Sequence, residues 1–344
     1  MSRPRLVALR ALGLGDLLTA VPALRALRRA FPEHRLVLAA PASLAPLAAL
    51  TGAVDETVDT APLAPLDPRL HGADLAVNLH GRGPQSHEVL EAAGPRRLIA
   101  LGRGGVAWRA GEHEVERWCR LLRECGIAAD PADLRLASPE VPSPAPGATV
   151  VHPGAASEAR RWPPDRWSAV ARAEREAGRD VVVTGSAAER GLAERVASEA
   201  GLAPASVLAG RTSLLELAAA VAAAGRVVCG DTGVAHVASA FGAPSVVLFG
   251  PVPPGEWGPP ATGPHVALWT GRRGDPHAAD PDPGLLEIGP QAVLAALSRL
   301  PEPAVSTSNG GVGEDHEHHR QDHRSHQESR GRSRGRRVAA PPGA

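Results

Sequence analysis

The feature that most constrains this chain is an alternation of short apolar runs with longer amphipathic ones, repeated on both sides of a proline-rich bridge. Residues 5–11 (RLVALRA) are compatible with a β-strand, and the apolar residues after them recur at helical spacing: Leu17, Val21, Leu24, Leu27 and Phe31. Further strands are expected at 34–41, 54–60, 73–81, 96–102, 149–154, 179–185, 206–210, 226–233 and 244–251. The helical patterns between and after them span 44–52, 113–127, 164–177, 187–201, 213–225, 234–242 and 289–300. Because strands that alternate with helices form parallel sheets covered on both faces, we predict an α/β fold of doubly wound sheets.

The bridge divides this pattern into two halves. Residues 137–148 (ASPEVPSPAPGA) hold four prolines in twelve residues, a composition that disfavours helix and sheet alike. A chain of 344 residues is long enough for two hydrophobic cores. We therefore expect an N-terminal domain over 1–140, a linker over 141–148 and a C-terminal domain over 149–300. The remaining residues, 301–344, have no aromatic side chain and include five histidines and an arginine-rich end, and we expect them to be disordered.

Composition argues against several classes of protein. The formal net charge is zero, so nothing in the overall charge favours a nucleic-acid partner. Three cysteines (Cys119, Cys125 and Cys229) form no CxxC pair and no zinc-binding spacing, which indicates a reducing compartment. No run of about 18 uncharged apolar residues occurs, and the N-terminus lacks a signal-peptide pattern. We expect a cytoplasmic protein without a metal site.

Polar and glycine-rich stretches follow the predicted strands, where ligands bind in open α/β sheets. The first of them, GLGD, contains Gly13, Gly15 and Asp16, and it imitates the start of the dinucleotide fingerprint GxGxxG. Leu18 stands where that fingerprint needs its third glycine, and no GxxxxGK[ST] occurs, which disfavours a nicotinamide enzyme and a P-loop ATPase. Asp16 is then a helix cap, part of a phosphate cradle or a catalytic base. A second stretch, residues 78–88, offers the polar side chains Asn78, His80 and Arg82.

The most informative stretch of the second half is GDTGVAH, residues 230–236. Asp231, Thr232 and Gly233 lie where a strand gives way to a helix, so backbone N–H groups and the threonine hydroxyl can bind a phosphate there. His236 follows one turn later. The alternative interpretation is an aspartate that caps the helix and a histidine exposed to solvent.

Two charged residues of the second half also have two interpretations. Arg160, next to Arg161 and just before a helix that starts with proline, can bind a phosphate through its guanidinium fork or belong to a solvated face. Glu189 can accept hydrogen bonds from ribose hydroxyls or simply complement the dipole of the helix that it begins.

Four stretches in this order resemble the heptosyltransferases of glycosyltransferase family 9: LGLGDLLTAVPALRALRRAFP, HPGAASEARRWPPDRW, LAGRTSLLELAAAVAAAGRVVCGDTGVAHVASAFGAPSVVLFGP and EWGP. The likeness covers residues 4–300. It implies a GT-B fold of two facing Rossmann-like domains, an ADP-heptose donor and inversion at the anomeric carbon without a required metal. It makes Asp16 the general base that deprotonates the acceptor hydroxyl, with Gly13 and Gly15 leaving room for the acceptor.

The resemblance also assigns the donor side. Asp231, Thr232, Gly233 and His236 would line the donor sugar and its diphosphate, Glu189 would bind the ribose, and Thr212 would lie beside the base. Arg160 stands where relatives carry a lysine that pairs with the diphosphate. Ala155 and Ala156 replace hydroxyl residues that touch phosphate in relatives, which leaves backbone N–H groups for that contact. Asn78, His80 and Arg82 fall on the acceptor side.

The function implied is transfer of a heptose or related sugar from a nucleotide diphosphate sugar to a hydroxyl of a glycolipid or glycan, as in lipopolysaccharide core biosynthesis. The alternatives are a GT-B epimerase or hydrolase of nucleotide sugars, and a non-catalytic nucleotide-sugar-binding protein, against which Asp16 argues. We expect no cofactor besides the donor substrate, and a monomer. Arg25, Arg28 and Arg29 are consistent with peripheral contact at the inner membrane or with a solvated helix face.

Overall fold

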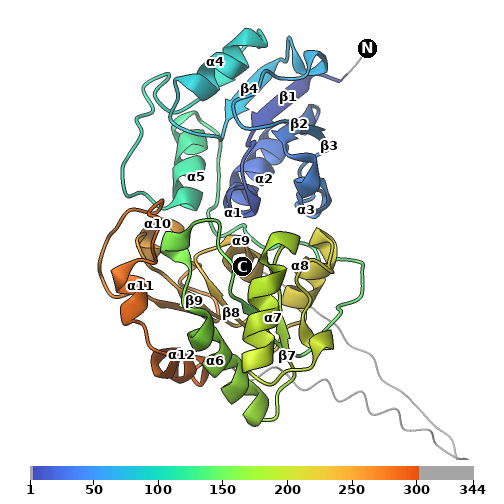
Figure 1. The fold of residues 1–344 in the computed structure, drawn as a ribbon. Helices are drawn as coiled ribbons and strands as arrows, with labels where there is room; N and C mark the ends of the chain where they lie inside the picture. The colour runs from blue at the N-terminus through green and yellow to red at the C-terminus, as the bar shows by residue number, and fades with distance from the viewer. Residues whose placement is uncertain (1–2, 302–344) are drawn as a thin grey trace, which may run out of the picture. The chain divides into compact units, whose positions relative to one another are not determined.

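The computed structural model describes residues 3–301, and these form two parallel five-stranded sheets (Figure 1). The expected disorder of residues 302–344, including the histidines, lies outside the described residues. The first sheet has the order β3-β2-β1-β4-β5 and comprises β1 (Arg5–Leu9), β2 (Arg35–Ala40), β3 (Glu56–Asp59), β4 (Leu75–Asn78) and β5 (Leu98–Ile99). The second has the order β10-β9-β8-β6-β7 and comprises β6 (Thr149–His152), β7 (Val181–Val183), β8 (Arg226–Gly230), β9 (Ser245–Leu248) and β10 (His265–Leu268).

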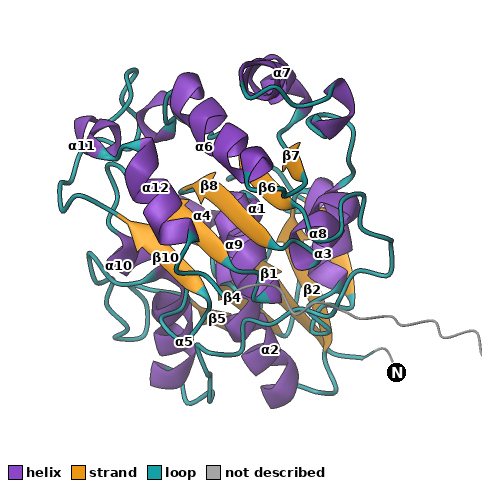
Figure 2. Cartoon of the chain, turned by 90° about the horizontal axis from the view of Figure 1, so that it is seen from below, coloured by secondary structure: helices purple, strands orange, loops and turns teal. Residues whose placement is uncertain are grey.

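Helices flank both sheets (Figure 2), as the alternation predicts. In the first half they are α1 (Leu14–Thr19), α2 (Val21–Ala30), α3 (Ala45–Ala49), α4 (Gln85–Ala92) and α5 (Glu114–Glu124). In the second they are α6 (Pro164–Glu176), α7 (Arg190–Glu199), α8 (Leu214–Ala222), α9 (Gly233–Phe241), α10 (Pro254–Trp257), α11 (Pro283–Glu287) and α12 (Pro290–Leu297). The doubly wound α/β fold is therefore confirmed.

Four local predictions need correction. The first helical pattern is two helices, because Pro22 near the start of α2 has no N–H to continue the ladder from α1. The polar stretch 78–88 is only partly a loop, since α4 begins at Gln85. Residues 206–210 contribute only an isolated bridge between Val207 and Val183 rather than a strand. The edge strand β10 has no counterpart in the predicted pattern.

Alternation along the strands separates the core into layers. In β1, Leu6 and Ala8 belong to one buried cluster, and Val7 and Leu9 belong to another on the opposite face. In β8, Val228 is likewise separated from its neighbours along the strand. Strands buried on both faces are what helices on both sides of a sheet require.

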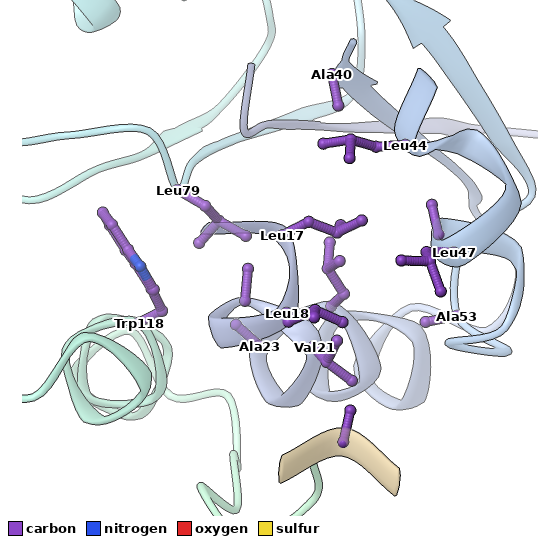
Figure 3. Packing of buried hydrophobic residues seen from close by; sticks show 14 of the residues in the cluster. Leu17, Leu18, Val21, Ala23, Ala40, Leu44, Leu47, Ala53, Leu79 and Trp118 are labelled. Carbon is purple, nitrogen blue, oxygen red and sulfur yellow. The ribbon is translucent and has the colours of Figure 1, made fainter. Parts of the chain in front are cut away.

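One of these clusters runs through both halves. Leu17 and Leu18 of α1 share it with Val234 and Ala238 of α9, because α1 packs against α9. Figure 3 shows the first-half part of this cluster, with Leu17 between Leu79 on one side and Leu44 and Leu47 on the other. Burial of apolar area of this kind stabilises at roughly 25 cal/mol per Å². The seam between the two sheets is thus a packed apolar interface.

The proline-rich bridge lies between α5 and β6, and no helix or strand occurs in the described residues 125–148. This matches the lack of helix and sheet expected from its prolines. The precise domain boundaries at 140 and 149 remain a proposal. With α5 before it and β6 after it, the bridge passes from one sheet to the other.

Candidate active site

A cavity of about 420 Å³ lies at the carboxyl ends of the strands and is lined from both halves of the chain. The segment after β1 contributes Gly13 to Asp16, and the segment after β8 contributes Asp231, Thr232, Gly233 and His236. Its other lining residues are Ala156, Arg160, Val252, Trp257, Pro276 and His277. The expected base and the expected diphosphate-binding residues therefore share one cavity. Below, we call it the cleft.

Asp16 is the third residue of α1 and caps this helix from within. Its Oδ2 accepts a hydrogen bond from the Gly13 N–H (3.1 Å), and Gly13 is the residue at the cap position. Its Oδ1 accepts from Nη2 of Arg10 at 3.3 Å. Since 27% of the side chain is exposed, the carboxylate is fixed by two donors and still reachable by a substrate. Capping and access to the cleft therefore coexist in this residue.

Sequence reasoning missed the site residue Arg10, because in the sequence it is only a charged residue that interrupts an apolar run. Its side chain is buried, and its guanidinium lies 4.9 Å from the centre of the Trp118 ring. Besides Asp16 it contacts Glu114, whose Oε1 accepts from Nη2 at 2.9 Å. The local signal was a lone arginine at the end of a buried strand, where a charge needs a partner.

Gly15 and Gly233 are required by the approach of α1 to α9. A Cβ atom on Gly15 would lie 2.8 Å from Cδ2 of His236, and one on Gly233 would lie 2.9 Å from Cβ of Leu14. Such distances are well inside van der Waals contact. The structure thus gives Gly15 a packing role, whereas the sequence interpretation gave it only the role of clearing space for an acceptor.

The start of α9 carries unpaired polar groups. Thr232 occupies the cap position, and its Oγ1 is buried without a hydrogen-bond partner among the described residues. The same holds for Nε of Arg160, whose Nη1 donates to the Asp231 carbonyl at 3.3 Å. Buried polar groups without partners are costly, so a ligand that supplies acceptors and donors here is favoured. Together with the helix dipole, these groups suit a phosphate.

The alternative interpretation of GDTGVAH is wrong in both parts. Asp231 does not occupy the cap position of α9, and His236 is buried rather than exposed to solvent. Burial raises the pKa of Asp231 to about 6, and the Arg160 guanidinium, 3.8 Å away, opposes this rise. Burial, with the charges of His113 and Arg10, lowers the pKa of His236 to about 4. His236 is therefore a neutral ring at pH 7, packed edge-on to Trp257 with ring centres 5.9 Å apart.

Glu189 and Thr212 do not line the cleft. The Glu189 carboxylate accepts from the N–H (2.8 Å) and the hydroxyl (2.9 Å) of Ser186, which caps the turn before α7. Burial works to raise the pKa of Glu189, but the Ser186 bonds and the charges of His152 and Arg161 hold it below its usual value. This carboxylate also lies against Gly154, where an added Cβ atom would overlap it. Thr212 is half-buried, two residues before α8.

The acceptor-side candidates at the end of β4 and in the loop after it also lie outside the cleft lining. Asn78 is fully buried: its amide donates to Ser86 Oγ (2.9 Å), and its carbonyl oxygen accepts from the His80 N–H (2.9 Å). It therefore shapes this loop rather than facing a substrate. Burial and the charge of Arg10 lower the pKa of His80, with Asp16 opposing them. Arg82 is exposed.

Trp257 and His277 complete the cleft, and neither was assigned a role from sequence. Trp257 belongs to the EWGP stretch that contributes to the family resemblance, so a signal for it existed. His277 lies in an irregular segment after β10 without any recognisable pattern. Only the folded chain brings it to the cleft.

The described residues hold no group of three or more His, Cys, Asp or Glu side chains arranged to bind a metal ion. Between residues 3 and 301, no helix is long and apolar enough to cross a membrane. Arg25 and Arg29 both pair with Asp133, and Arg28 pairs with Asp55. These arginines therefore have partners within the protein, besides any that a membrane could offer.

The chain matches the sequence model of glycosyltransferase family 9 (heptosyltransferase) over residues 103–277. It is 37% identical over 159 residues to lipopolysaccharide heptosyltransferase 1 of Pseudomonas aeruginosa, an alignment that covers 44% of this chain and 43% of that protein. Lipopolysaccharide heptosyltransferase 2 of Escherichia coli is 33% identical over 153 residues, which cover 41% of this chain and 43% of that one. The chain thus spans less than half the length of these curated relatives.

Solved structures superpose on 86–87% of this chain. Heptosyltransferase II of E. coli superposes with a TM-score of 0.68 at 23% identity, covering 86% of this chain and 97% of that one. The E. coli heptosyltransferase WaaC, solved with ADP, superposes with a TM-score of 0.65 at 18% identity, covering 86% of this chain and 99% of that one. The E. coli glycosyltransferase TibC, described as iron-containing and dodecameric, superposes with a TM-score of 0.56 at 15% identity. The superposition covers 87% of this chain and 76% of that one. These superpositions establish a shared fold, and the expected GT-B architecture with two parallel sheets is confirmed.

Proposed function

Because this chain belongs to glycosyltransferase family 9, we propose that it is an inverting glycosyltransferase that moves heptose from ADP-heptose to a hydroxyl of a lipopolysaccharide core acceptor. The names of its relatives support this substrate pair, since they are lipopolysaccharide heptosyltransferases and one related structure holds ADP. The observation that carries the proposal is the division of chemistry across the cleft. A carboxylate comes from one half, and unpaired phosphate-binding groups come from the other.

Inverting transfer needs these two groups on opposite sides of the anomeric carbon. The acceptor hydroxyl oxygen forms a bond to the anomeric carbon, and its proton passes to Asp16 Oδ1 or Oδ2. On the opposite face, the bond from the anomeric carbon to the diphosphate oxygen breaks, and the electron pair leaves with the ADP. Arg160, the Thr232 hydroxyl and the first N–H groups of α9 would stabilise that developing negative charge. Each of these groups lines the cleft.

His236 and Asp231 would hold the donor sugar. A neutral imidazole offers one donor and one acceptor to sugar hydroxyls, and the low pKa of His236 keeps the ring neutral. Its packing against Trp257 fixes the orientation of the ring. Asp231 would accept hydrogen bonds from sugar hydroxyls, and its pairing with Arg160 links sugar and diphosphate recognition.

The adenosine would extend toward Glu189 and Thr212, beyond the cleft lining. Glu189 reaches the neighbourhood of Gly154, directly before Ala155 and Ala156, whose backbone N–H groups would face the phosphates. Glu189 would bind the ribose hydroxyls while it retains its bonds to Ser186. On the other side, Gly13, His80 and Arg82 would contact the acceptor, with Asn78 shaping their loop.

The same proposal implies where the protein acts, its oligomeric state and its cofactor requirement. The protein would act in the cytoplasm as a monomer, at the inner face of the membrane that carries a glycolipid acceptor. It would need no metal or cofactor besides its donor substrate, because Arg160 and the α9 terminus supply the positive potential that a metal supplies elsewhere.

The test is incubation of the purified protein with ADP-heptose, ADP-glucose, UDP-glucose and GDP-mannose, each with and without heptose-free lipopolysaccharide. We expect a heptosylated product only with ADP-heptose and the acceptor, an inverted anomeric configuration by NMR, and unchanged rates in EDTA. Conversion of the donor without acceptor would instead identify an epimerase or hydrolase. Binding of ADP-heptose with no turnover of any pair would identify a non-catalytic binding protein.

A further inference from the structure

We infer that Arg10, held by Glu114, is the positioning residue for the Asp16 carboxylate; this inference rests on the proposed function. Arg10 follows β1 directly, and only 1% of its side chain is exposed. Burying an unpaired guanidinium costs several kcal/mol, so its partners must be numerous and well oriented. They comprise Asp16, which lines the cleft, and three further partners that lie outside its lining: Thr19, Leu79 and Glu114.

The guanidinium plane bonds to Asp16 twice. Nε donates to the Asp16 main-chain carbonyl at 2.9 Å, and Nη2 donates to its Oδ1 at 3.3 Å. Nη2 also donates to Thr19 Oγ1 at 3.1 Å, and Nη1 donates to the Leu79 carbonyl. Because the fork is rigid and planar, bonds to both the backbone and the side chain of Asp16 fix its position and its rotamer together. The same group fixes the loop that begins at His80.

Glu114 determines how Arg10 can act. Its Oε1 accepts from Arg10 Nη2 and from the Trp118 indole N–H, both at 2.9 Å, and its Oε2 accepts from Arg117 Nε at 3.0 Å. The Arg10 guanidinium is thus closer to the buried Glu114 carboxylate than to the exposed edge of Asp16. Arg10 therefore has a second, buried carboxylate partner besides Asp16, and Glu114 shares this carboxylate with Arg117.

This arrangement also fits the charge changes of the reaction. When Asp16 takes the acceptor proton it becomes neutral, and Arg10 still has a buried carboxylate partner in Glu114. No unpaired buried charge then develops during the transfer, which would otherwise cost several kcal/mol. A network in which Arg10 has a second carboxylate partner, shared with Arg117, is therefore better suited to a base than an isolated ion pair.

The same helix provides a matched control. Arg120 of α5 is buried and forms two bonds with Glu112, from Nε at 2.6 Å and from Nη2 at 2.8 Å. Neither residue lines the cleft. Arg120→Gln removes a buried arginine–glutamate pair that includes neither Asp16 nor Glu114, so it measures the structural cost of losing such a pair.

The experiment measures kcat, the acceptor KM and the dissociation constant of ADP for each variant, with ADP-heptose and heptose-free lipopolysaccharide as substrates. We expect Arg10→Gln to lower kcat about 100-fold with the ADP affinity within about threefold of wild type, because the base is misplaced while the donor-binding surface remains. The acceptor KM should rise by less than about tenfold, because the Leu79 carbonyl loses its bond to Arg10 just before the acceptor loop. Arg10→Lys should recover about tenfold of the loss of kcat, since it restores the charge without the fork. Glu114→Gln should also lower kcat, by about tenfold, whereas Arg120→Gln should lower the melting temperature and leave kcat unchanged.

An equal loss of kcat in Arg120→Gln, or an Arg10→Gln enzyme with wild-type kcat, would overturn the inference. If Arg10→Gln does not fold, the double variant Arg10→Gln/Glu114→Gln removes one positive and one negative charge together and should show the same loss of kcat. If the wild-type protein transfers no sugar, the proposed function fails, and a crystal structure of the Arg10 variant then tests the positioning separately. There the Asp16 carboxylate should leave the Gly13 N–H, and an unmoved carboxylate refutes the role.

Discussion

The substitution Gly15→Ala tests how tightly the two halves meet at the cleft. The added methyl group would lie 2.8 Å from Cδ2 of His236, 3.3 Å from its Nε2 and 3.7 Å from the Gly233 Cα. Overpacking of this kind costs about 1–3 kcal/mol. The variant also gains about 0.5–1 kcal/mol, because alanine is the better helix former at the second position of α1.

Gly191→Ala is the matched control, since Gly191 is the second residue of α7 and a Cβ atom there meets nothing within 4 Å. This control variant should gain only the stability that alanine adds as the better helix former. The difference in unfolding free energy between the two variants therefore gives the cost of overpacking at Gly15. That difference corresponds to about 2–10 °C in melting temperature. Gly15→Ala should also lose about 10-fold to 100-fold in transfer rate, because His236 must move in the cleft. Equal melting temperatures for the two variants, with full activity of Gly15→Ala, would refute the close approach.

Three further predictions concern the cleft. Asp16→Asn should keep the bond to Gly13 and the ADP affinity but lose about 10² to 10⁴ in transfer rate, and turnover within a few fold of wild type would exclude it as the base. Arg160→Ala should weaken ADP binding about 10-fold to 100-fold by calorimetry, as the loss of a charged hydrogen bond to phosphate predicts; an unchanged affinity would place the diphosphate elsewhere. Asp231→Asn should raise the stability at pH 7 by about 2–3 kcal/mol, because the folded-state pKa of about 6 lies above the unfolded value of 3.8. The raised pKa favours the protonated form, so wild-type stability should fall as the pH rises from about 4 to 6, and the gain of the variant should vanish below pH 4. Melting curves across this range check the sign, and a gain that persists at pH 3 would contradict the linkage.

The secondary structure was predictable because its signals are local. The period of apolar residues distinguishes strand from helix within one segment, and the alternation of the two already requires parallel sheets. One failure was also local in origin. A proline split the first helix into α1 and α2. The edge strand β10 is as long as β3, which was predicted, but it is only partly buried and it is defined by its pairing with β9.

The candidate site was predictable in part. Loops after β1 and β8 were expected at the ligand-binding edge, and Asp16, Arg160 and His236 do line one cleft. Glu189 and Asn78 differ, because their side chains are engaged in local hydrogen bonds with Ser186 and with the loop after β4. A polar residue at a strand end can serve the loop or the ligand, and sequence spacing is the same for both.

The sequence by itself determined the two α/β halves, the bridge between them and the family, since each depends on patterns within a few dozen consecutive residues. Only the tertiary structure decided what Arg10 and Gly15 do. Arg10 meets Glu114 across 104 positions of sequence, and Gly15 meets His236 across more than 200. A buried charge needs a partner of opposite charge, and two helices in close contact need a glycine between them. Tertiary packing determines which positions of the chain form such pairs, and no local sequence pattern shows them.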